Sequence, residues 1–199
     1  DLILQTAESG PLGVSGDATL STGTSARGTS GKISVTTGFA NSGSGGMIDL
    51  SVGKGNFGNG GKIVAAAGES SAPASAGGDV LISAGLGSST SNTNGGSGGD
   101  VVVRGGDARG GHSTLNAGGN IELFAGNAAA SSGGSIVIAS GVGAKTSSGD
   151  IVALTADAGT SGVSGSISMS TGASSHGNSG AVIINSGPAK VGRGGDISI

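Results

Sequence analysis

Short runs of alternating apolar and polar residues recur along the whole chain, and a glycine bounds each run. In residues 31–38, GKISVTTG, Ile33 and Val35 alternate with Lys32, Ser34 and Thr36. Apolar residues at every second position predict a β-strand with one buried face. The period of two, together with a glycine every few residues, argues against helix.

The glycines that open these runs are spaced by about fifteen residues. They are Gly16, Gly31, Gly46, Gly61, Gly78, Gly99, Gly119, Gly134, Gly149, Gly165, Gly180 and Gly195. A first run opens at Asp1, so the chain holds thirteen repeats, the last of which reaches Ile199. We number the places of each repeat from its opening glycine. The second and fourth places are mostly Ile, Val or Leu, the sixth is small, and the seventh is usually glycine again.

The constant spacing predicts an all-β fold, a single-stack parallel β-solenoid, or β-helix, of about thirteen rungs. Each rung would hold one main strand and a return wall rich in Gly, Ser and Ala. Residues 1–199 would form one repeat array, with longer rungs over 61–118. The rungs that open at Gly61, Gly78 and Gly99 carry two, six and five extra residues after the strand. Such insertions map to loops on one side of a solenoid.

Composition and charge exclude several classes of function. The net charge is −3 and there is no basic run, so nucleic-acid binding is not expected. No stretch approaches the roughly 18 apolar residues of a membrane helix, so no membrane span is expected. The chain has 46 glycines, no Cys, Trp or Tyr, and only three Phe, so it has few of the aromatic residues on which globular cores depend.

No catalytic constellation emerges, and we expect no enzymatic activity. Residues 53–58 match G-x-G-x-x-G and residues 95–99 match G-x-S-x-G. Neither precedes the helix that its chemistry requires. The two histidines, His112 and His176, lie four repeats apart and have no cysteine to share a metal with.

The first place of the repeat is the only recurrent acidic position. It holds Asp1, Asp17, Asp79, Asp100, Asp150 and Asp196. The G-G-x-G-x-D order of calcium-binding nonapeptide repeats is absent, and Lys32 and Lys62 interrupt the column. We therefore expect no cofactor, with calcium as the alternative. In a ladder of stacked rungs, Asp17 beside Lys32 and Lys62 beside Asp79 would relieve like-charge contacts.

The third place should face away from the core, yet it is often apolar. The candidate assembly stripe at this place consists of Val64, Leu81, Val102, Val137 and Val152. Exposed apolar patches of this kind usually mark contacts. The stripe therefore predicts self-association of the chain into a fibre.

The cassettes GGDVLISAG (residues 77–85) and GGSIVIASG (residues 133–141) resemble the glycine-rich solenoid repeats of secreted fibre and surface proteins. Similar repeats occur in proteins of algae and other microbial eukaryotes and in viral fibres. The resemblance implies a structural or adhesive protein that is extracellular or lies on a cell or virion surface. It transfers no catalytic residue.

The sequence thus predicts a structural subunit or segment of an extracellular fibre, built by stacking and lateral packing of rungs. One alternative is a surface adhesin or glycan-binding module that uses the loops 86–98 and 107–118. A weaker alternative is an ice-binding solenoid, for which Thr19, Ser21, Ser34 and Thr36 would begin the outward hydroxyl array.

Overall fold

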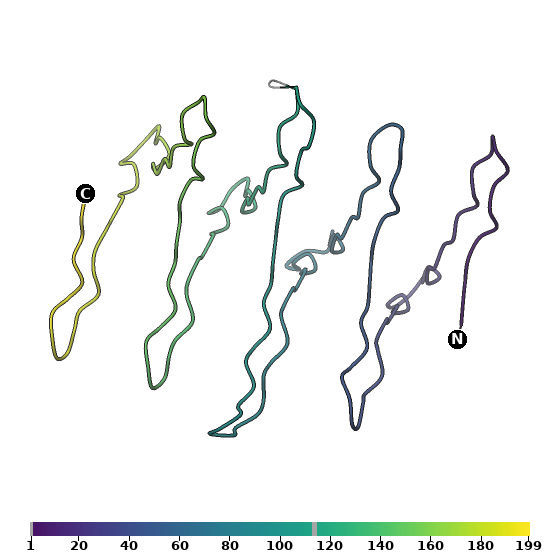
Figure 1. The fold of residues 1–199 in the computed structure, drawn as a ribbon, viewed down its shortest axis with the longest axis horizontal. Coiled ribbons are helices and arrows are strands. Elements are labelled where there is room, and N and C mark those ends of the chain that lie inside the picture. The colour runs from purple at the N-terminus through teal and green to yellow at the C-terminus, as the bar shows by residue number, and fades with distance from the viewer. Residues whose placement is uncertain (1, 113–114) are drawn as a thin grey trace. The chain divides into compact units, whose positions relative to one another are not determined.

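The computed structural model describes residues 2–112 and 115–199, and these residues contain neither a helix nor a strand. The chain consists of open, extended segments joined by loops (Figure 1). It divides into two units, Asp1–Val102 and Val103–Ile199, and each is considered by itself below.

The predicted all-β parallel solenoid, or β-helix, is therefore wrong. A β-strand requires a neighbouring strand that accepts and donates its backbone hydrogen bonds. In the described residues, every backbone–backbone hydrogen bond lies within or at the base of a loop, and none reaches places one to five of a repeat. Period-two alternation indicates an extended segment, but it does not show that the next repeat of the same chain lies beside it.

Each repeat reverses the chain once, in its second half. The reversals are bends or turns that we call the tips, and in the shorter repeats they lie at about places ten to thirteen; examples are 26–28, 41–43, 129–131 and 175–177. In the long repeat that opens at Gly78 the tip lies further along, at 92–94. Glycine permits the left-handed backbone at several tips, with φ of +100° at Gly28 and +75° at Gly58. The second half of a repeat is thus a loop that projects outward, and the predicted return wall is also wrong.

The loops close where the opening glycine of one repeat meets the end of the preceding extended segment. We call this junction the neck. In five successive repeats the opening glycine donates its N–H to the carbonyl of the preceding seventh-place glycine. These bonds run from Gly78 to Gly68, Gly99 to Gly85, Gly119 to Gly106, Gly134 to Gly126 and Gly149 to Gly141, over 2.9–3.0 Å.

The sixth-place residue determines which necks carry this bond. Small residues occupy the sixth place at all five, namely Ala67, Ala84, Gly105, Ala125 and Ser140. The necks without it have Thr6, Thr22, Thr37, Val52, Thr155, Thr171 and Ser186. A Cβ added to Gly31 would lie 3.3 Å from the Cγ2 methyl of Thr22. The branched methyl group therefore occupies the neck and keeps the two backbones apart, and only Ser186 departs from the rule.

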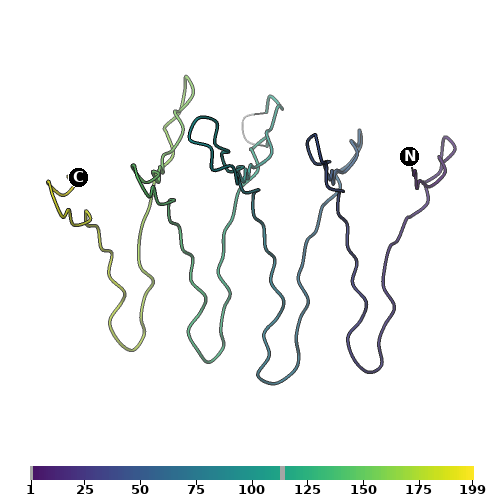
Figure 2. The same cartoon turned by 90° about the horizontal axis from the view of Figure 1, so that it is seen from below.

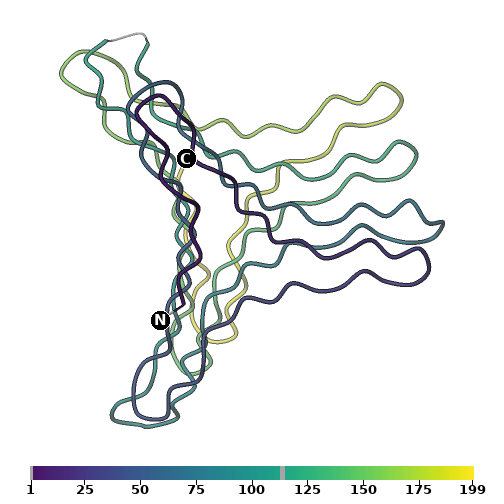
Figure 3. The ribbon, with the colours of Figure 1, turned by 90° about the vertical axis from the view of Figure 1, so that its right-hand side faces the viewer.

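Within each unit, successive loops leave the extended segments in three directions in turn. In the first unit, the loops with tips at 26–28 and 72–74 extend to the same side (Figures 2 and 3). Those with tips at 41–43 and 92–94 share another direction (Figure 1). Repeats that are three apart therefore correspond, whereas consecutive repeats point away from one another. This path is the reason that consecutive repeats of one chain form no ladder.

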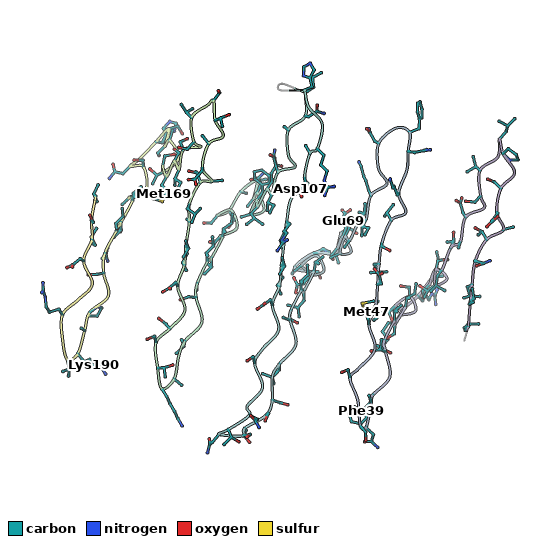
Figure 4. All side chains as sticks on the ribbon, viewed as in Figure 1. Phe39, Met47, Glu69, Asp107, Met169 and Lys190 are labelled. Carbon is teal, nitrogen blue, oxygen red and sulfur yellow. The ribbon has the colours of Figure 1, made fainter. Side chains whose placement is uncertain are left out.

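No described residue is buried, so the fold of the single chain has no core. The apolar side chains of the second place are nevertheless more covered than those of the third place. From Ile33 onward the second-place Ile and Val side chains are 48–64% exposed, against 67–87% for the apolar third-place residues. Met47 on an extended segment and Phe39 shortly before the tip at 41–43 are both largely exposed, at 83% and 93% (Figure 4).

Candidate assembly surface

The five residues of the predicted assembly stripe are all exposed, but one chain does not unite them. Val64, Leu81 and Val102 lie in the first unit, and Val137 and Val152 lie in the second. Their exposed fractions range from 67% at Val102 to 87% at Leu81. Within the first unit, consecutive repeats point in different directions, so Val64, Leu81 and Val102 do not form one continuous patch there (Figure 3).

The apolar surface of the chain extends far beyond that stripe. The accessible area is 19743 Å² for a mass of 18.1 kDa. A compact monomer of this mass exposes about 8,000 Å², and the unfolded chain about 26,000 Å². The single chain thus retains about three-quarters of its unfolded surface. Exposed apolar surface well above that of a compact monomer usually marks a site of interaction.

The backbone of the extended segments is also unpaired. Places one to five supply no donor and no acceptor to any backbone–backbone hydrogen bond of the described residues. Both edges of each segment therefore present N–H and C=O groups, which is the chemistry that recruits another extended chain. The surface that the structure offers is the whole set of these segments, with their second-place and fourth-place apolar side chains.

The loop 86–98 forms internal hydrogen bonds. The Ser91 hydroxyl oxygen accepts bonds from the backbone N–H groups of Thr93, at 3.3 Å, and Asn94, at 3.1 Å. At the base of the loop, Gly87 lies so close to the backbone of Gly96 and Ser97 that a Cβ would overlap it. The polar groups near the tip are thus partly used within the loop itself.

The loop 107–118 is closed by Asn116. Its Oδ1 atom accepts a bond from the N–H of His112 at 3.0 Å, and its N–H donates to the His112 carbonyl at 3.3 Å. Residues 113 and 114 lie outside the described part of the chain. The Asn116 amide group also lies against Gly110, where a Cβ would overlap it.

The acidic first place does not assemble a metal site within the single chain. Asp1 is outside the described residues, and the rest of the described chain contains no group of three or more His, Asp or Glu side chains that could hold a metal ion. His176 contacts the Ser175 hydroxyl at 3.1 Å, and both side chains are exposed. No pocket is present in the described residues.

Comparison of the chain with protein-family models, with curated proteins and with solved structures finds no match. In the described part of the chain, no helix has the length and apolar character needed to cross a membrane. Function is therefore argued from the chain's own residues.

The neck is the structural feature that the sequence interpretation missed. The sequence pattern identifies the sixth place only as small. Among the described residues, seven are partly covered, and four of them stand at this place: Thr6, Gly105, Ala125 and Thr155. Along the chain, the sixth-place residue changes from Thr and Val to Ala, Gly and Ser, and then back to Thr. This change in side-chain size is the signal in the sequence from which the two kinds of neck could have been predicted.

Proposed function

We propose that this chain is a structural subunit of an extracellular fibre, and that association with other copies completes its fold. The observation that carries the proposal is that none of the described residues is buried, although Ile, Val and Leu side chains recur at regular spacing. Ordering the backbone of each residue costs about 1–2 kcal/mol, and burial of apolar surface is the main term that offsets this cost. A single chain that buries almost none cannot hold this shape, so other chains must cover it.

The extracellular assignment rests on the resemblance of the glycine-rich cassettes to the repeats of secreted fibre proteins. The structural role is favoured over adhesion because residues of the loops 86–98 and 107–118 form hydrogen bonds within the same loop, and the described part of the chain contains no pocket. The described residues offer no site that would select a small ligand.

The proposal is tested by sedimentation and negative-stain imaging of the purified chain, with and without the triple substitution Val64→Thr, Leu81→Thr and Val102→Thr. Threonine is β-branched and favours extended structure, and it removes apolar area at all three positions. Each lost apolar contact is worth at most about 1.5–3 kcal/mol. We expect filaments from the natural chain and their loss from the triple variant.

The matched control replaces three loop residues, Leu12, Val14 and Leu86, by threonine. Their exposed fractions are 88–103%, and they lie outside the extended segments. The control should form filaments like the natural chain. A natural chain that stays monomeric at every concentration, or a stripe variant that assembles normally, would contradict the proposal.

A further inference from the structure

The open edges of the extended segments have a geometry that selects a particular partner. We propose that three copies of this chain intertwine about a common three-fold axis, so that each extended segment pairs in parallel with the next repeat of a neighbouring copy. The inference rests on the proposed structural role and specifies its partner, since a fibre could also be built from copies packed side by side.

The three directions of the loops are the first argument. Within a unit, each repeat is related to the previous one by a rotation about a common axis and a translation along that axis. Loops of repeats that are three apart therefore point in the same direction (Figure 3). A copy turned by one third of a revolution therefore places its repeat n+1 directly above repeat n of the first copy. A third copy places repeat n+2 above that, and repeat n+3 of the first copy follows. Three copies thus fill one turn, and every segment gains a parallel neighbour on both edges.

The register that follows is the second argument. Each place of a repeat meets the same place of the next repeat, so the second-place apolar residues align between copies. At the first place, Asp17 meets Lys32 and Lys62 meets Asp79. Two neighbouring pairs at this place are like-charged, Asp1 with Asp17 and Asp79 with Asp100. Copies stacked with the same repeat side by side would instead bring each of these charges against itself, which is unfavourable.

The area to be covered is the third argument. The chain exposes roughly 12,000 Å² more than a compact monomer of its mass. A standard interface covers only about 800 Å² on each partner. Docking of one face against a second copy leaves most of this surface in water, whereas intertwining covers both edges of every segment. The inserted loops do not obstruct this arrangement, because they lie beyond the necks.

The test uses engineered cysteines, for which the absence of natural cysteine leaves no background. Val137 and Val152 occupy the third place of consecutive repeats. Paired parallel strands lie about 4.8 Å apart, within the Cα separation of about 4.4–6.8 Å that a disulfide spans. The variant Val137→Cys with Val152→Cys is oxidised under mild conditions and run on a denaturing gel without reductant.

We expect a covalent trimer, because each copy links to the next until the ring closes. Two controls should remain monomers: Val137→Cys alone, and Val137→Cys with Ile183→Cys, whose positions are three repeats apart. A second adjacent pair, Ser34→Cys with Asp49→Cys, should behave like the first, and it replaces only polar side chains. It keeps the test valid if loss of the valines impairs folding.

The outcomes separate this inference from the proposed function. Links within single chains, linked dimers or open-ended polymers, or a failure of both adjacent pairs to link, overturn the three-fold arrangement. Filaments without covalent trimers overturn this arrangement alone. Covalent trimers that never form filaments support it and refute the fibre role.

Discussion

The neck of the repeat offers a test at the level of a single hydrogen bond. In the repeat that opens at Gly119, the sixth-place Ala125 leaves room for the Gly134 N–H to reach the Gly126 carbonyl at 2.9 Å. A Cβ on Gly134 would already lie 3.4 Å from the Ala125 Cβ, so the space at this junction is small. The substitution Ala125→Thr adds a methyl and a hydroxyl group there. We expect it to separate the two backbones and to remove the bond, as at the natural threonine necks.

The size of the effect follows from the bond that is lost. A typical hydrogen bond contributes about 0.5–1.5 kcal/mol net, so exchange of the Gly134 amide hydrogen should accelerate by about two- to twelvefold. Amide exchange followed by NMR or mass spectrometry measures this change locally. The reciprocal variant Thr37→Ala should slow exchange at Gly46, because its neck then resembles the five that carry the bond.

Ala125→Gly is the matched control, because Gly105 occupies the sixth place of a neck in which the Gly119 N–H still donates to the Gly106 carbonyl. This variant should leave exchange at Gly134 unchanged. The reasoning fails if Gly134 exchanges equally fast with alanine and threonine at residue 125, or if Thr37→Ala leaves Gly46 unaffected.

Three further perturbations test other parts of the fold. Gly143→Ala should lower the melting temperature, because a Cβ at this position would overlap the Ser147 carbonyl. A Cβ at Gly141 would meet open space, so Gly141→Ala should leave the melting temperature nearly unchanged. Equal melting temperatures for the two variants would contradict the geometry. Ala74 adopts φ of +56°, a left-handed conformation that costs a residue with a Cβ about 1 kcal/mol, so Ala74→Gly should leave the free energy of unfolding unchanged or raise it slightly. Gly28 adopts φ of +100°, so Gly28→Ala should lower the free energy of unfolding by a similar amount. Chemical denaturation measures both changes. Finally, the melting temperature followed by circular dichroism should rise with protein concentration, because folding and association are coupled; a constant value over a hundredfold range would show that the chain folds alone.

The sequence was sufficient to predict where each repeat begins and which half of it is extended. The alternation around Ile33 and Val35 and the glycines at each junction identify the extended segments. The structure also supports close approach as the reason for the opening glycines, since Gly134 is hydrogen-bonded at the neck and has no left-handed backbone.

The sequence could not identify the partner of each extended segment. A period of two shows that one face of an extended segment is more apolar than the other. The same pattern results whether the neighbouring segment belongs to the same chain or to another chain. The predicted ladder of Asp17 beside Lys32 assumed one chain, and no backbone hydrogen bond of the described residues forms it. The path that separates consecutive repeats depends on how each loop leaves its neck, which no local pattern encodes.

The neck explains why this chain tolerates insertions of such different lengths. The loops that follow Gly68, Gly85 and Gly106 contain the two, six and five extra residues, and all three close through the same bond as the short loop after Gly126. Closing a longer loop costs only slightly more entropy, since each doubling of length adds about 0.6 kcal/mol. A single backbone hydrogen bond contributes an amount of the same order. Because the extra residues lie beyond the neck, they leave the register of the extended segments unchanged, and that register is what any assembly through these segments requires.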